Sequence, residues 1–350
     1  MELLKDKGMQ YKSLRTNTAG EPSILMVGML YSVTVALFIF GGSFIRIGGF
    51  YVRSLLAEII LILFPPLIAL YIFKHDFKKV LRLNKIGFLE LFLIFWIINF
   101  SLPIVAVFNI INLWLAELIF GEATVVQPPV AADYPNLLFS IIVVGVAAGV
   151  CEEVLFRGVI MRGLERLGPA VSIIMTAFLF SIMHISFEKL FGTFLLGAII
   201  GFIVWRTNSI YGGIFAHFVN NTIGLITIYT TSKLSGMAGM SQVDVSESLD
   251  SLSDIFSKMK MSDIAVFIIV WGIILLFSGF ILAALIIALV KITEPNFRVN
   301  NENRSIENRS NENIICGVEK RNKKKVNIAE LLTFIPGIIL LVLTYFLSVR

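Results

Sequence analysis

Residues 136–160 read NLLFSIIVVGVAAGVCEEVLFRGVI, and this stretch decides the class of the protein. It is apolar for long enough to cross a lipid bilayer, which takes about 20 residues of helix. Its only charged residues are Glu152, Glu153 and Arg157, all near its end. Ionisable side chains are costly within a membrane, so those that occur there normally have a partner or a function.

The rest of the chain has the same character. Of the 350 residues, 57% are hydrophobic and 15% are charged, whereas a soluble domain carries about 25% charged residues. Within lipid a segment must satisfy its own backbone groups, so apolar segments of this length are helices. The sequence therefore predicts an all-α fold, a polytopic transmembrane helical bundle of about eight core spans plus one C-terminal span. The predicted spans are residues 24–45, 54–73, 88–108, 136–160, 170–187, 190–206, 209–231, 263–290 and 327–348.

The basic residues predict the orientation of the bundle. If the N-terminus is cytoplasmic, 22 of the 29 Lys and Arg residues fall in segments on the inner side, as the positive-inside rule requires. Residues 46–53, with two arginines, are the mild exception. This distribution accounts for the net charge of +5 without a nucleic-acid partner. We expect an integral protein of a bacterial plasma membrane that contacts membrane lipids. The sequence predicts no particular oligomeric state.

The segments outside the spans predict three domains. Residues 1–292 form the transmembrane bundle, residues 293–326 a disordered cytoplasmic linker rich in Asn, Glu and Lys, and residues 327–350 an additional C-terminal helix. Residues 109–120 are expected to form a separate interfacial helix. Apolar residues from Val245 to Met259 recur at helical spacing, which predicts a short amphipathic helix in the outer loop.

Polar residues inside the apolar spans point to a functional site. Glu153 and Arg157 are four residues apart, the favourable spacing for an ion pair on one helix face, and we expect them to support the site. Glu152 points to another face and has no local counter-ion. His184 lies in the fifth predicted span, and His217 and Asn221 share one face of the seventh. Alone, each histidine could equally be a structural tether between helices.

The turns allow these groups to meet. Glu152 and His184 are both 16 residues from Gly168, where the chain turns, so in an antiparallel hairpin they stand at the same depth, about 24 Å from the turn. His217 follows the turn at Asn208 by nine residues. Three helices are therefore expected to converge on one polar site. Small residues in Gly-xxx-Gly spacing, Gly145 with Gly149 and Gly197 with Gly201, favour close packing of the same helices.

Three motifs in this order resemble those of a known family. They are Glu152-Glu153-xxx-Arg157, Phe180-xxx-His184 and His217-xxx-Asn221, and they resemble the motifs of the CAAX prenyl protease-like and bacteriocin-processing membrane proteins, the CPBP or Abi family. The resemblance covers about residues 136–231. It implies an intramembrane glutamic endopeptidase in which Glu152 is the catalytic carboxylate, His184 its partner, and His217 and Asn221 the oxyanion donors. Glu153, Arg157 and Phe180 would support the site.

Such an enzyme would hydrolyse hydrophobic, lipidated or precursor peptides with an activated water and no metal or other cofactor. Cys151 adjoins Glu152, but neighbours on a helix point apart, so a thiol nucleophile is not expected. One alternative is a zinc-dependent membrane peptidase, although the usual HExxH spacing is absent. Another is a non-catalytic bacteriocin-immunity or scaffold protein of the Abi type. A transporter would predict inverted repeats, which the sequence does not show.

Overall fold

The structure, a computed structural model, describes residues 20–121, 134–237, 259–315 and 328–348. In these ranges every regular element is helical and no strand occurs, which confirms the predicted all-α class. Seven helical segments are long and apolar enough to cross a membrane, and we conclude that the chain is an integral membrane protein. They are Ile24–Phe44, Phe50–Ile72, Phe88–Phe120, Asn136–Leu167, Phe187–Thr207, Met261–Val299 and Ala329–Leu347. The amphipathic helix predicted near residues 245–259 lies almost wholly outside the described residues.

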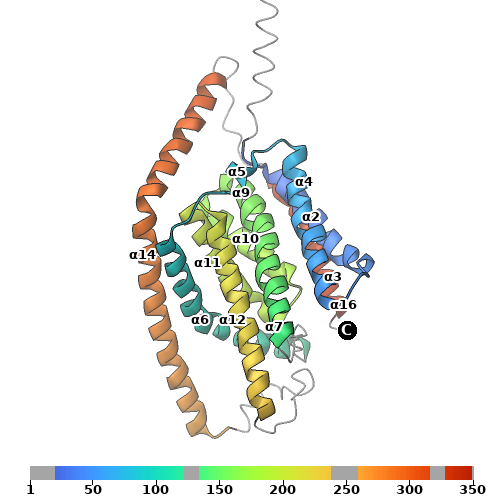
Figure 1. Cartoon of the computed structure of the whole chain (residues 1–350), viewed down its shortest axis with the longest axis vertical. Helices are drawn as coiled ribbons and strands as arrows, with labels where there is room; N and C mark the ends of the chain where they lie inside the picture. The colour runs from blue at the N-terminus through green and yellow to red at the C-terminus, as the bar shows by residue number, and fades with distance from the viewer. Residues whose placement is uncertain (1–19, 122–133, 238–258, 316–327, 349–350) are drawn as a thin grey trace, which may run out of the picture.

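Two further predicted spans are helices that are not among these seven. The helix predicted at 170–187 is α10 (Pro169–Met183), which ends one residue before His184 and is shorter than the other spans. The helix predicted at 209–231 is α12 (Ile210–Met237), whose apolar run is interrupted by His217, Asn220 and Asn221. Both lie among the other helices (Figure 1). α12 carries His217 and Asn221 of the predicted site, and His184 follows the end of α10.

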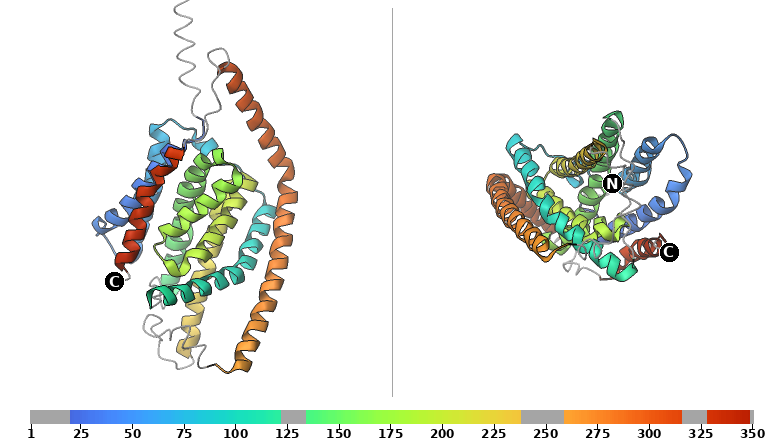
Figure 2. Two further views of the ribbon diagram at one scale, coloured as in Figure 1. Left: turned by 180° about the vertical axis from the view of Figure 1, so that it is seen from behind. Right: turned by 90° about the horizontal axis from the view of Figure 1, so that it is seen from below.

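The predicted break between residues 108 and 109 is wrong. α6 (Phe88–Phe120) continues through it as one helix, with Pro103 inside. A proline within a helix removes one backbone hydrogen bond and bends the axis instead of ending the helix. Figure 2 shows α6 bending so that its second half runs across the long axis of the molecule. Asn112 on this second half accepts a hydrogen bond from the backbone N–H of Phe191, which attaches it to the start of α11 (Leu190–Thr207).

The prediction of a disordered segment from residue 293 is wrong for its first part. α14 (Met261–Ile315) runs along one edge of the molecule without a break (Figure 1). Its polar part has a partner that the local sequence does not reveal, because Arg206 of α11 donates to Val290 O at 2.6 Å and to Thr293 Oγ1 at 2.9 Å. The same guanidinium pairs with Glu294. The rest of the predicted linker, residues 316–327, lies outside the described residues.

The C-terminal helix belongs to the bundle. α15 (Ile328–Leu331), η8 (Leu332–Phe334) and α16 (Ile335–Ser348) pack against α2 (Ile24–Ala36), and Figure 2 shows α16 beside α2. Ser32 Oγ donates to Thr333 O at 2.7 Å and accepts from the N–H of Gly337 at 3.1 Å. Phe334 is buried in the same hydrophobic cluster as α2. The last helix therefore covers a face of the first.

The predicted span 136–160, which carries Glu152 and Glu153, lies at the centre of the bundle. It runs as α7 (Tyr134–Ser140), η4 (Ile141–Ala147), α8 (Ala148–Glu153), η5 (Val154–Ile160), α9 (Met161–Leu164) and η6 (Glu165–Leu167). The segments η4 and η5 are π-helical. α12 packs against η4, α8 and η5, and η3 (Glu58–Leu63), between α3 (Phe50–Ala57) and α4 (Phe64–Ile72), also packs against α8. The helix that carries the carboxylates is thus in contact with both α12 and the second span.

A polar cluster fixes one end of these helices. Arg82 follows α5 (Phe77–Val80), pairs with Glu165 at the end of the central span, and donates to Asn208 Oδ1 at 3.0 Å. Asn208 occupies the left-handed turn (φ 50°) between α11 and α12. Because one side chain joins both turns, the positions of α8 and α12 along their axes are set relative to each other.

Candidate active site

The two adjacent carboxyls of α8 have different surroundings. Glu153 is fully buried, whereas 18% of the Glu152 side chain is exposed. They end a short α-helical segment that has a π-helical segment on each side. Such wide turns alter the register of a helix and are common at functional sites. Here the carboxyl of Glu153 is enclosed by the protein, whereas that of Glu152 is accessible.

Glu153 and Arg157 form the predicted ion pair. Arg157 Nη1 lies 2.6 Å from Glu153 Oε1, and both side chains are completely buried. Arg157 Nη2 donates to Gly197 O at 3.0 Å, and the guanidinium lies 4.5 Å from the centre of the Phe180 ring. A buried charge pair is tolerated when further hydrogen bonds and contacts satisfy it. The pair joins η5 to α10 and α11 and supplies a fixed carboxylate to the site.

His217 lies between the two carboxyls. Its Nδ1 is 3.0 Å from Glu153 Oε1, and its Nε2 is 3.8 Å from Glu152 Oε2. An imidazole nitrogen beside a carboxylate carries the proton and donates it, so Nδ1–H bonds to Glu153. The ring is buried, and its edge meets Phe180 at a centroid distance of 5.8 Å. Nε2 is therefore the nitrogen left for chemistry, and it faces Glu152.

His184 occupies a position that the sequence did not predict. It caps the end of α10 and is exposed, whereas we expected it inside a longer span. The helix ends here because Ile185 adopts a left-handed conformation (φ 49°). His184 Nδ1 is 3.0 Å from Phe180 O and donates to it, which leaves Nε2 available. The Phe180 ring contacts the imidazoles of both His184 and His217, so one aromatic side chain connects the two histidines.

Asn221 lies one helical turn beyond His217 on α12. Its amide nitrogen donates to Val144 O at 2.8 Å, and its oxygen accepts from Asn220 at 3.0 Å. Val144 belongs to η4, where a wide π turn leaves some carbonyls without their usual helical partner. One N–H of the Asn221 amide is used in this contact, and the second is available to a ligand.

Glu58 is a member of the cluster that the sequence reading missed. It begins η3, and its charge interacts with that of Glu152 across the packed helices. The signal that could have found it is the one that singled out Glu152, namely a carboxylate inside an apolar span. Glu58 was overlooked because it stands close to the start of the predicted span 54–73, where a charged residue is ordinary.

Glycine at position 213 leaves room for the buried pair. A Cβ atom there would lie 2.5 Å from Val204 Cγ2 and 2.8 Å from Glu153 Oε2. Gly213→Ala is therefore expected to lower the free energy of unfolding by about 1–3 kcal/mol, the usual cost of overpacking, and to disturb the contact of Glu153 with His217. The matched control is Gly272→Ala on α14, where a Cβ meets nothing within 4 Å. Denaturation in detergent compares them, and equal stability would contradict this account of Gly213.

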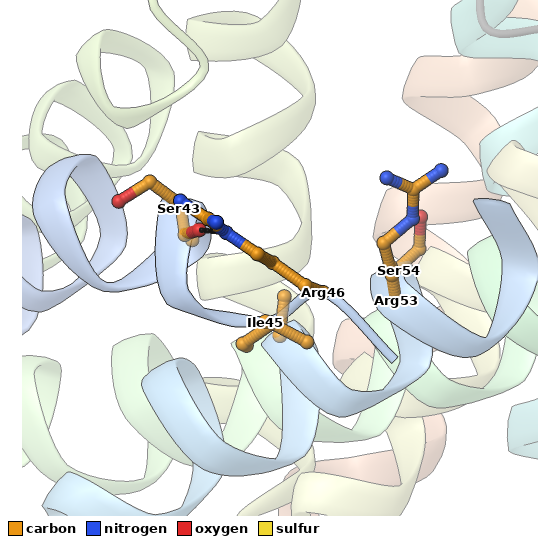
Figure 3. Close-up of a pocket in the computed structure, with 7 residues that line it drawn as sticks. Ser43, Ile45, Arg46, Arg53 and Ser54 are labelled. Carbon is orange, nitrogen blue, oxygen red and sulfur yellow. Dashed lines mark hydrogen bonds between the residues drawn. The ribbon is translucent and has the colours of Figure 1, made fainter. Parts of the chain in front are cut away.

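A separate pocket opens at the loop between the first two spans (Figure 3). It has a volume of about 680 Å³ and is lined by Gly42, Ser43, Ile45, Arg46, Arg53, Ser54 and Ala57. Arg46 Nε donates to Ser43 O at 3.3 Å. The lining includes no histidine or carboxylate, so we do not assign the reaction to this pocket. Arg46 and Arg53 are the two arginines that make residues 46–53 the exception to the positive-inside rule.

The described part of the chain does not assemble a metal site of the usual kind. No three His, Cys, Asp or Glu side chains within it are arranged so that they could hold a metal ion. The groups that do meet are Glu152, Glu153 and His217, of which Glu153 is already bonded to Arg157. The zinc alternative would therefore need a rearranged set of ligands.

The fold and the cluster define a class. The protein is a polytopic membrane protein with a buried Glu–Arg pair, a histidine between two carboxyls, and an amide donor on the same helix. Residues 134–223 match the family described as type II CAAX prenyl endopeptidase Rce1-like. The chain therefore contains a domain of this Rce1-like family, to which the names CPBP and Abi also apply. It is a family of CAAX prenyl endopeptidases, which are hydrolases that cut peptide bonds.

The match agrees with the resemblance inferred from the sequence. It covers 90 of the 350 residues and includes all three motifs. No curated protein and no solved structure gives a significant match to the chain.

Proposed function

We propose that this protein is an intramembrane peptidase that hydrolyses hydrophobic, lipidated or precursor peptides with a water activated by Glu152. The observation that carries the proposal is the position of His217, with Nδ1 against the fixed carboxylate of Glu153 and Nε2 directed toward Glu152. The partial exposure of Glu152 supports access of water to its carboxylate, while the family match supports a peptide as the substrate.

In the proposed mechanism Glu152 takes a proton from water as the oxygen attacks the carbonyl carbon of the scissile bond. His184, through its free Nε2, accepts a hydrogen bond from the same water. Glu152 then returns the proton to the nitrogen of the leaving amine, and a carboxylic acid and an amine are released. General acid–base catalysis of this kind contributes about 10²- to 10⁴-fold to a rate.

The negative charge that develops on the carbonyl oxygen needs donors. We assign His217 Nε2–H and the second N–H of the Asn221 amide to this role. For this role His217 carries a proton on each ring nitrogen, with Nδ1–H bonded to Glu153 and Nε2–H free to donate. Each such donor is typically worth about 3 kcal/mol of barrier. Asn221 is held in place by its bond to Val144 O.

The test is cleavage of a panel of hydrophobic and prenylated fluorogenic peptides by the detergent-purified protein, with and without a chelator. We expect cleavage that survives the chelator and is absent in Glu152→Gln. Loss on chelation with recovery on adding zinc would replace this mechanism with the metal alternative. Cleavage of no peptide by the wild type, with intact folding, would favour the immunity or scaffold alternative.

A further inference from the structure

The surroundings of Glu152 contain more negative charge than the ion pair accounts for. Glu58 and Glu152 interact electrostatically across the contact between η3 and α8. Oε2 of each side chain is buried and has no hydrogen-bond partner among the described residues. Among the described residues, Arg157 hydrogen-bonds Glu153 and Gly197 O and neither of these two carboxyls.

Apart from η5, which carries Arg157, the elements that pack against η3 provide no cation for Glu58 in the described chain. η1 (Leu37–Gly41) has no titratable residue, Tyr71 on α4 is 77% exposed, and Arg53 on α3 lines the open pocket. Tyr51 on α3 hydrogen-bonds Ser140 Oγ at 3.1 Å. From α8 the thiol of Cys151 interacts electrostatically with both carboxyls, which adds no positive charge.

The apolar environment limits how many of the two carboxyls, Glu58 and Glu152, can be ionised at once. Among the described residues, the three carboxyls of Glu58, Glu152 and Glu153 face only two possible cations, Arg157 and His217. The carboxyl in excess repels its neighbour and loses hydration, so the pair of Glu58 and Glu152 retains a proton. His217 Nε2 lies 3.8 Å from Glu152 Oε2 and connects Glu152 to the ion pair. Glu152 thus interacts with His217 of α12 and with Glu58 of the second span.

We propose that Glu58 is a positioning residue whose carboxyl shares one proton with Glu152. Glu58 holds the proton and donates a hydrogen bond to the ionised Glu152, which fixes the orientation of the base and keeps it ready to accept a proton from water. The π-helical turn that starts at Glu58 supports this placement, since π turns commonly redirect a side chain at functional sites. The effect on turnover rests on the proposed function, whereas the shared proton does not.

Infrared spectroscopy of the purified protein tests the proton without any substrate. At neutral pH the wild type is expected to show a carbonyl band of a protonated carboxyl group that Glu58→Gln lacks, because Glu152 alone, beside His217, is ionised. Glu90→Gln is the matched control, since Glu90 accepts from the backbone N–H of Gly87 at the start of α6, and it should keep the band. The same spectrum in the wild type and Glu58→Gln would overturn the proposal.

Kinetics test the positioning role. Glu58→Gln keeps an uncharged donor, so kcat/KM should stay within about threefold of the wild type. Glu58→Ala should lose about 10- to 100-fold, the range for a lost hydrogen bond to a charged group. The fall in activity at alkaline pH that follows loss of the shared proton should be absent in Glu58→Gln. If Glu58→Gln is as inactive as Glu152→Gln, or if both Glu58 variants match the wild type at all pH values, the proposal is wrong.

These outcomes separate the two proposals. A wild type that cuts no peptide but loses the infrared band in Glu58→Gln would contradict the proposed function and support the carboxyl pair. A wild type that cuts peptides in a Glu152-dependent way, with unchanged spectra and kinetics in the Glu58 variants, would support the proposed function and contradict the carboxyl pair.

Discussion

Replacing Glu152 with Gln is expected to lower kcat/KM for a cleaved peptide by about 10²- to 10⁴-fold, the range for loss of a general base. The helical bundle should stay folded. Gln has nearly the same shape as Glu, and Glu152 makes no ion pair with an arginine or lysine of the described chain that the substitution would break. His217, the buried imidazole beside Glu152, keeps its bond to Glu153, so no buried charge is left without a partner.

The measurement is initial rate against peptide concentration for wild type and Glu152→Gln, together with thermal unfolding of each in the same detergent. Glu90→Gln, a carboxyl at the start of α6, is the control for the loss of a negative charge. Its kinetics should equal those of the wild type. Retained cleavage in Glu152→Gln would show that another group activates the water, and equal losses in activity and folded fraction would show that the residue is structural.

The sequence predicted the class and the central ion pair because both depend on local patterns. Apolar runs of span length identify helices, and the spacing of Glu153 and Arg157 places them on one face. The structure confirms their pairing at 2.6 Å. It also brings His217 next to both carboxyls, whereas the depth argument from the turns had paired Glu152 with His184.

Tertiary contacts determined what the sequence could not give. Arg206, distant in the sequence, bonds α14 at Val290, Thr293 and Glu294, where the predicted span ends and the helix continues. His184 is a helix cap because of the backbone conformation of Ile185, which no periodicity indicates. Glu58 joins the site because η3 packs on α8, a contact between two spans that residue spacing within either span does not predict.

Arg157→Met is expected to have the largest effect on stability. It removes the only guanidinium bonded to Glu153 in the described chain and leaves a carboxylate that is fully buried. Breaking a buried pair by removing one partner typically costs about 3–5 kcal/mol. Met has a similar length and fills much of the space over Phe180, so the loss reports mainly on charge. Unfolding in detergent by heat or denaturant measures it.

The double variant Glu153→Gln/Arg157→Met separates charge from packing. It removes both charges, so it should be more stable than Arg157→Met alone, since replacing both partners of a buried pair is often nearly neutral. Arg298→Met is the matched control, because Arg298 pairs with Glu294 at the same four-residue spacing but is 74% exposed, and exposed pairs contribute little. If the two single variants were equally stable, the buried pair would not be what holds η5 against α10 and α11. If the double variant recovered stability but stayed inactive, the pair would instead be required to hold His217 for catalysis, as its bond to Glu153 implies.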